Sequence, residues 1–320
     1  MRYDYLMRRP FEIVARRPYL WLLGFLAGAA TTFNFSSGGT NYGHPATSGT
    51  YHGPSWAVLQ NMWHDNWEWI AGLLAVFAVI FVVMFVLGCI ATGGIIHAAV
   101  EHDADNEYAL GRAWRAGYET GWRIAGLRLL TFLLAIVPGF LVGSLVLAAV
   151  AGAMSSAAAA VGFGLMAAAA ILVSIAFWFA LGLAFQFAQR LVVLEDGNVA
   201  QSLSTGFRMI RWHFKEVALG WLILMAVSIV VGIAVAILAV VVAIPGVALG
   251  IGGWAVGGMT GAIVAGSVAA VSVAAVFFVG ILLVATGAAS AYSSVYWTLL
   301  FRSVRSLPAP AARGAIIRTA

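Results

Sequence analysis

A short stretch in the first half of the chain gathers side chains that could bind a metal ion or transfer protons. Six ionisable residues fall within eleven positions: His97, Glu101, His102, Asp103, Asp105 and Glu107. In a helix, His97 and Glu101 would share one face because they are four residues apart. Imidazole and carboxylate groups are common metal ligands and proton-transfer groups. The alternative is a solvated turn whose acids pair with Arg112 and Arg115.

A second acidic turn lacks histidine, which weighs against a catalytic role shared by both turns. It holds Glu195 and Asp196. An enzyme would need the first cluster, with His97 and Asp103, to converge with Glu195, because acid–base catalysis requires hydrogen-bond reach or one bridging water. We therefore predict no catalytic residues and no enzymatic activity.

Three histidines occupy the segment 36–68, which is rich in glycine, small polar and aromatic residues. They are His44, His52 and His64, with Asp65 and Glu68 close behind. Such side chains can bind zinc or copper, but their spacings fit no compact metal motif. The other interpretation is an ordered cap, with tryptophans that anchor the next span at the membrane interface, namely Trp56, Trp63, Trp67 and Trp69. We predict no cofactor and leave metal binding by these histidines as an open alternative.

Basic side chains recur on one face of segments that have helical periodicity. Leu203, Phe207, Ile210 and Phe214 share one face, whereas Ser204, Arg208, Arg211 and Lys215 share the other. A helix of this kind lies flat at the headgroup level, where guanidinium groups meet lipid phosphate. We therefore predict a lipid-headgroup surface made of five residues: Arg112, Arg115, Arg208, Arg211 and Lys215.

Composition places all these groups in or beside a membrane. Residues of the set AVILMFWYC make up 62% of the 320 residues and charged residues only 9%, whereas a soluble domain carries roughly 25% charged residues. Soluble enzymes and secreted disulfide scaffolds are thereby excluded. Cys89 is the only cysteine, so an internal disulfide and a CxxC site are impossible. The net charge of +5 sits at predicted membrane edges, so we do not expect nucleic acid as a partner.

Apolar stretches of about 20 residues, the length that crosses a bilayer as a helix, occur six times. They are Tyr19–Phe35, Trp69–His97, Ile124–Ala151, Gly162–Phe187, Val217–Ile244 and Ala262–Leu283 or beyond. The predicted fold is an all-α, polytopic transmembrane bundle of six spans arranged as three hairpins, each preceded by a cytoplasmic interfacial amphipathic helix. The last apolar run continues to Leu300, so we expect its helix to project into the cytoplasm or to break near Gly287.

The basic residues also predict the orientation. All seventeen Lys and Arg residues precede span one, follow span six, lie between or just inside spans two and three, or lie between spans four and five. By the positive-inside rule both termini are cytoplasmic. We predict a multi-pass protein of the bacterial cytoplasmic membrane.

The cytoplasmic segments resemble one another, which suggests an internal repeat. Leu110 aligns with Leu203, and Arg115 with Arg208, each pair 93 positions apart. A weaker third copy opens the chain, where Pro10 would begin a helix at its first position. We predict an integral membrane domain over 1–305, made of unit one (1–97), unit two (98–188) and unit three (189–305), and a flexible cytoplasmic tail over 306–320.

Few polar groups fall inside the predicted spans. No acidic, lysine or histidine residue lies near a midplane, and ion-coupled transporters usually carry such groups. Arg128 can snorkel, and Gln186 and Gln189 flank the inner end of span four beside Arg190. Gly139 and Gly143 form a GxxxG spacing that favours close helix packing within the chain. Whether the glycine-rich turn 245–261 re-enters the membrane stays open.

One stretch resembles a known group. The residues from Arg190 through Glu195 to Leu203, followed by Phe207 and Arg208, resemble a pattern in bacterial six-span proteins that are similar to the membrane domain of some glycerophosphoryl diester phosphodiesterases. The resemblance implies an integral membrane protein, accessory or lipid-associated. Only twenty residues follow Leu300, so we expect no catalytic domain and no phosphodiesterase activity.

These observations lead to one functional expectation and one alternative. We expect a non-enzymatic, lipid-associated accessory or scaffold subunit of a membrane complex, with anionic lipids as partners and with membrane-protein partners or a homo-oligomer open. The alternative is a carrier or channel for an uncharged or lipidic solute, which would need a continuous polar or hydrated groove between the repeats.

Overall fold

The computed structural model of the chain describes residues 3–31, 56–238 and 283–307, and four single residues between the last two ranges. Across these residues the secondary structure is helical, with no strand. The helices are α1 (Tyr3–Arg16), α2 (Tyr19–Thr31), α3 (Trp56–Asp103), α4 (Leu110–Ser155), α5 (Ala157–Leu194), α6 (Val199–Trp212), an unlabelled helix Phe214–Leu238, and α8 (Leu283–Arg305). Helices suit these apolar sequences because a helix satisfies its own backbone hydrogen bonds in lipid.

Four of the helices are long and apolar enough to cross a membrane. They are Trp67–Asp103, Leu110–Gly152, Val161–Leu194 and Phe214–Leu238. Four of the six predicted spans are therefore present as apolar helices of sufficient length, and the chain is a membrane protein. The first predicted span corresponds to α2, of which 13 residues are described. Most of the sixth lies outside the described residues.

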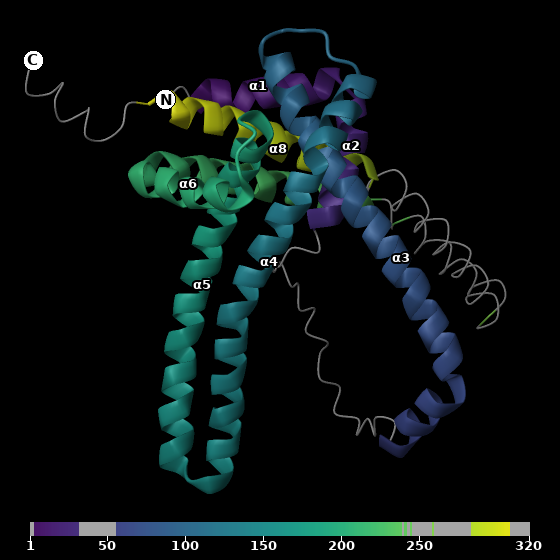
Figure 1. Cartoon of the computed structure of the whole chain (residues 1–320), viewed down its shortest axis with the longest axis vertical. Helices are drawn as coiled ribbons and strands as arrows, with labels where there is room; N and C mark the ends of the chain where they lie inside the picture. The colour runs from purple at the N-terminus through teal and green to yellow at the C-terminus, as the bar shows by residue number, and fades with distance from the viewer. Residues whose placement is uncertain are drawn as a thin grey trace, which may run out of the picture.

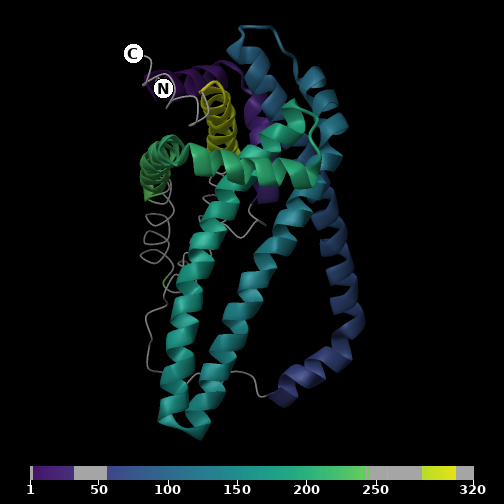
Figure 2. The same ribbon diagram turned by 60° about the vertical axis from the view of Figure 1, so that its left-hand side comes forward.

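Buried residues gather at one end of the molecule, which we call the packed end. It contains α1, α2, α6, α8, the last turns of α3 and α5 and the first turns of α4 (Figure 1). From there α3 and the α4–α5 hairpin extend away as long arms (Figure 2), and their large apolar side chains are exposed. Apolar surface of this extent needs lipid or a protein partner around it.

Close helix contacts at the packed end depend on small residues. A Cβ added to Gly24 of α2 would lie 2.1 Å from the Gly287 carbonyl oxygen of α8, and one on Gly117 of α4 would lie 2.1 Å from the Ile90 oxygen of α3. Gly206 of α6 approaches the Ala184 oxygen of α5 similarly, at 2.7 Å. In each pair a glycine lets one helix backbone reach the backbone of another.

Several local predictions were wrong. Pro10 lies inside α1 and is buried, as Leu6 and Ile13 of the same helix are, although proline gives up a backbone hydrogen bond there. The segment from Trp56 to Glu68 is helical and continues into α3, so the predicted outer loop is shorter. The second predicted interfacial helix is no separate element, because Leu110 begins α4 itself.

The glycine predictions for the spans also need correction. α8 runs unbroken through Gly287, and that glycine packs against α2. Gly139 and Gly143 have no close backbone neighbour among the described residues; a Cβ on Gly143 would meet nothing within 4 Å. The GxxxG pair therefore does not mediate the α4–α5 contact.

Candidate functional site

Asp103, at the end of α3, is the centre of a polar cluster at the packed end. Its carboxylate accepts hydrogen bonds from the Tyr5 hydroxyl and, at 2.5 Å, from Arg302. Arg9 of α1 lies 3.9 Å away and donates to the Asp103 carbonyl oxygen at 3.2 Å. The Asp103 side chain is only 13% exposed. One carboxylate thus joins α1, α3 and α8.

Arg9 completes this cluster on its outer side. Its Nη2 donates to Asp105 at 2.5 Å and to the His102 carbonyl oxygen at 3.3 Å. The bond to Asp105 raises the pKa of Arg9 above its usual range, so this guanidinium stays charged. The sequence predicted that these acids would pair with Arg112 and Arg115. They pair instead with Arg9 and Arg302, because α1 and α8 pack beside the end of α3.

The second acidic turn is held in a similar way. Glu195 pairs with Arg305 of α8 at 2.5 Å, and Asp196 pairs with Arg123 of α4 at 2.5 Å. Asp196 adopts the left-handed backbone region with φ 52°, as Asp105 does with φ 57°. Aspartate tolerates this conformation better than most residues. Both turns therefore end a long helix with an aspartate and are tied to α8.

His102 lies inside the packed end and does not face a shared acidic site. Its Nε2 is 2.6 Å from the Tyr19 hydroxyl, and its Nδ1 is 3.2 Å from the Asn106 carbonyl oxygen. The ring of Tyr108 meets His102 edge-on at 6.4 Å. Glu101 accepts instead from the Asn106 amide at 2.9 Å. His102 and Glu101 thus have structural partners in the packed end.

Metal-binding geometry is not seen in the part of the chain that the structure describes: no group of three or more His, Cys, Asp or Glu side chains is placed to hold an ion. This observation does not test whether the histidines of the segment 36–68 bind a metal. His44 and His52 lie outside the described residues, and so does the side chain of His64. Trp67 and Trp69 are exposed at the far end of α3, as an interfacial anchor requires.

The predicted headgroup residues are all exposed at the packed end. Arg112 lies over the Tyr108 ring at 5.1 Å, and Arg208 over the Trp212 ring at 5.7 Å. Arg115 pairs loosely with Glu119 at 3.5 Å, with both side chains largely exposed. An exposed pair of this kind contributes at most about 1 kcal/mol and leaves Arg115 available to a stronger partner.

The opposite face of α6 is buried in protein. Leu203, Gly206 and Ile210 are buried, as the helical periodicity predicted, but Gly206 packs against α5. The prediction that this face rests on lipid is therefore wrong, because the described residues of the face pack against protein. Phe214 is 56% exposed and belongs to the next helix. The basic face of α6 nevertheless points away from the core.

Two arginines are buried inside the helix bundle. Arg190 is 1% exposed and donates to the Gln186 and Gln189 side chains at 2.7 and 3.1 Å and to the Ser294 carbonyl oxygen of α8 at 3.2 Å. Arg128 is 2% exposed. Among the described residues it donates to Thr92 at 3.0 Å, and its Nε and Nη1 find no hydrogen-bond partner there. The sequence suggested that Arg128 snorkels outward, but its side chain is buried in the bundle. Its hydrogen bond to Thr92 links α4 to α3.

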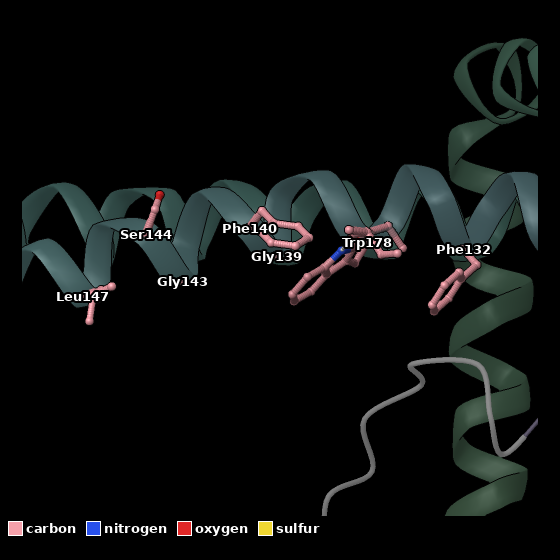
Figure 3. A pocket seen from close by; sticks show the side chains of 9 residues that line it. Phe132, Gly139, Phe140, Gly143, Ser144, Leu147 and Trp178 are labelled. Atoms are coloured by element: carbon pink, nitrogen blue, oxygen red, sulfur yellow. Dashed lines mark hydrogen bonds between the residues drawn. The ribbon is translucent and has the colours of Figure 1, made fainter.

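An apolar groove of about 540 Å³ follows the α4–α5 hairpin. Phe132, Leu147 and Trp178 project from the same side of these two helices (Figure 3). The Trp178 indole donates to the Ala135 carbonyl oxygen at 3.1 Å, which fixes the ring. Apart from Ser144, the side chains that line the groove carry no hydroxyl or charge. The groove lies within one hairpin and is apolar, so it is not the polar groove between repeats that a carrier was expected to need.

Sequence reasoning missed the residues that hold the packed end together. Tyr5, Tyr19, Arg302 and Arg305 attracted no functional interpretation, yet they contact Asp103, His102 and Glu195. One signal was present: Arg302 and Arg305 lie one helical turn apart at the end of an apolar run, where a charged pair facing the acidic turns is reasonable.

Comparison with known proteins places the chain in one group. A model described as "Family of unknown function (DUF7544)" matches residues 14–306. No curated protein and no solved structure matches the chain. Nothing in these comparisons links it to the membrane domains of glycerophosphoryl diester phosphodiesterases.

Proposed function

The chain belongs to the DUF7544 family of unknown function, and on that premise we propose that it is a non-enzymatic membrane protein that binds anionic lipid as an accessory or scaffold subunit. Its binding surface consists of Arg112, Arg115, Arg208, Arg211 and Lys215. The observation that most directly supports this proposal is that these five side chains are exposed on helices whose other faces are buried in the packed end.

The surroundings of these residues suit the membrane interface. Trp122 is 86% exposed and Tyr118 is 71% exposed on α4, and Trp212 is 50% exposed at the end of α6. Tryptophan and tyrosine concentrate at the headgroup level of a bilayer. Arginine and lysine close to such a belt attract anionic lipid with roughly 1 kcal/mol each. The five residues together can thus select acidic headgroups.

We also propose the finer architecture that the sequence predicted. The protein has six spans in three hairpin units, lies in the bacterial cytoplasmic membrane and keeps both termini in the cytoplasm. Every described basic residue lies on α1, on α8, between α1 and α2, or on helix segments at the packed end, which supports a cytoplasmic packed end. The glycine contacts between α2 and α8, between α4 and α3, and between α6 and α5 resemble one another. This similarity supports an arrangement of repeating units. The similarity to phosphodiesterase membrane domains stays a hypothesis.

The test compares lipids that copurify with two triple variants in native nanodiscs. Replacing Arg208, Arg211 and Lys215 with Gln removes three charges, whereas R208K/R211K/K215R keeps them. Mass spectrometry should show fewer bound anionic lipids for the Gln variant and wild-type amounts for the charge-preserving control. Unchanged lipid retention in the Gln variant would refute the lipid surface. Stoichiometric partner proteins in the same samples would support the accessory role.

A carrier of a lipidic solute is the second candidate, because the apolar groove on α4 and α5 is large enough for part of an acyl chain. The variant Gly143→Trp fills the groove, and Gly72→Trp is a control because Gly72 also faces open space but lies on α3. Proteoliposomes would be assayed for transfer of a fluorescent phospholipid between leaflets. Transfer that is lost in Gly143→Trp only would favour the carrier.

A further inference from the structure

A small polar pocket lies where α1 meets the α3–α4 junction, apart from the lipid surface described above. Its volume is about 80 Å³. Its lining includes Arg9, Glu12 and Arg16 of α1, Arg17 directly after that helix, His102 near the end of α3, and Asp105 of the junction. The volume is roughly half of the ~150 Å³ cavity that admits benzene. The space suits one small tetrahedral ion or headgroup fragment.

The two acids of the pocket share one arginine. Arg9 lies 2.5 Å from Asp105 and 3.8 Å from Glu12. Arg16 and Arg17 are exposed and form no ion pair with any residue the structure describes. Three arginines and two acids line the pocket, so it has an excess of one positive charge, and its unpaired guanidinium groups are those of Arg16 and Arg17. Guanidinium groups match the geometry of phosphate oxygens.

One donor of the pocket also lacks an acceptor. The Nε of Arg9 is buried without a hydrogen-bond partner, and its nearest acid oxygen, on Asp103, is 3.9 Å away, beyond hydrogen-bond distance. His102 contributes no free donor, since both of its ring nitrogens contact Tyr19 and Asn106. An oxyanion in the pocket would satisfy Arg9 and balance Arg16 and Arg17.

We infer that this pocket binds a phosphate group, as a phosphomonoester or phosphodiester, with Arg16 and Arg17 as its principal ligands. The position suits either source of that group. α2, an apolar helix, begins at Tyr19 directly after Arg17 and Pro18, so the pocket lies close to headgroup height. Free phosphate can also enter, because both arginines are exposed. The inference does not depend on the proposed lipid surface, which uses other residues.

The experiment measures phosphate binding to the full chain in nanodiscs made of zwitterionic lipid. Inorganic phosphate and short-chain phosphatidic acid are titrated separately at constant ionic strength, with chloride as the salt control. Four variants are compared with wild type: R16Q/R17Q, the charge-preserving R16K/R17K, R112Q/R115Q in the proposed lipid surface, and R8Q as the control. Arg8 is exposed on α1 and lies outside both the pocket lining and the lipid surface. All the replaced side chains are exposed, so all variants should fold, as size-exclusion profiles and thermal unfolding will show.

We expect R16Q/R17Q to bind the phosphate probe at least tenfold more weakly, R16K/R17K to retain most of the affinity, and R8Q to match wild type. Saturation by inorganic phosphate would identify a site for free phosphate, and binding of phosphatidic acid alone would identify a lipid headgroup site. Equal affinities of wild type and R16Q/R17Q for both probes would overturn the inference. A loss confined to R112Q/R115Q would assign phosphate recognition to the lipid surface instead.

Discussion

The guanidinium of Arg302 lies 2.5 Å from the carboxylate of Asp103, although 199 positions separate the two residues. The same carboxylate accepts a hydrogen bond from Tyr5, so the first, third and last described helices meet at one side chain. An acid with 13% exposure and two charged neighbours has a larger energetic role than a surface ion pair.

Replacing Asp103 with Asn should therefore destabilise the packed end. The variant keeps the size of the side chain but removes the charge partner of Arg302, whereas Arg9 keeps its pair with Asp105. We expect a loss of about 1–3 kcal/mol in unfolding free energy, seen as a lower midpoint in thermal unfolding. Glu119→Gln is the control, since its pair with Arg115 is exposed. Equal midpoints for Asp103→Asn and wild type would contradict this role.

The contact between Gly24 and α8 allows a sharp steric test. A Cβ at position 24 would lie 2.1 Å from the Gly287 carbonyl oxygen and 2.8 Å from the Ala291 nitrogen, so Gly24→Ala must push α2 and α8 apart. Overpacking of this kind costs about 1–3 kcal/mol. Gly72→Ala adds the same methyl group where nothing lies within 4 Å and should leave the unfolding midpoint unchanged. A tolerated Gly24→Ala would mean that the two helices do not pack this closely.

The two buried arginines should respond differently to replacement by methionine. Arg190 has three different acceptor residues, among them Ser294 on α8, so Arg190→Met strands several polar groups and should cost roughly 2 kcal/mol or more. Arg128 has one hydrogen bond and two unpartnered nitrogens, and its desolvation is poorly compensated. Arg128→Met should be nearly neutral. The reverse order in thermal unfolding would show that Arg128 has a partner outside the described residues.

The raised pKa of Tyr5 leads us to expect a loss of stability at alkaline pH. Burial, followed by the hydrogen bond to Asp103, raises the pKa of Tyr5 above its ordinary value of 10.0. The folded state holds this proton more tightly than the unfolded chain, so the contribution is complete below pH 10.0 and is lost as pH rises through the higher folded-state pKa. Tyr5→Phe should be less stable than wild type at pH 8, and the gap should narrow above pH 10. A gap that does not change with pH would exclude the linkage.

Orientation can be tested with single cysteines, because Cys89 is the only native one and is buried. In a Cys89→Ala background, a cysteine replaces Ser156 in the α4–α5 turn or Ser204 on α6, and both positions are exposed. In spheroplasts a membrane-impermeant maleimide should label position 156 directly and position 204 only after lysis. The opposite labelling pattern would place the packed end outside the cytoplasm.

The positions of four spans were predictable, because hydropathy and length alone determine which helices can cross a bilayer. The faces of α6 were also predictable, since buried Leu203 and Ile210 and exposed Arg208 and Arg211 follow the 3.6-residue period. These properties are local. They depend on neighbouring residues and on solvent, and both can be read from a single segment.

The partners of the polar groups were not predictable in the same way. Asp103 pairs with Arg302 only because α8 returns to the end of α3, and no periodicity encodes that approach. Gly24 and Gly287 were missed for a related reason: each meets the backbone of a distant helix, whereas the GxxxG motif that drew attention, Gly139 with Gly143, faces an open groove. The phosphate pocket likewise requires α1 to lie against the α3–α4 junction.

The packing of α2 against α8 has a consequence for biosynthesis. α2 is among the first segments to leave the ribosome, and the helix whose backbone it contacts through Gly24 and Gly287 is among the last. At about 5–20 residues per second, α2 waits for its partner for roughly ten seconds or longer. During that interval its glycine face must be shielded by lipid, an insertase or a chaperone. A truncation that removes α8 would therefore leave a nascent chain exposed to membrane quality control.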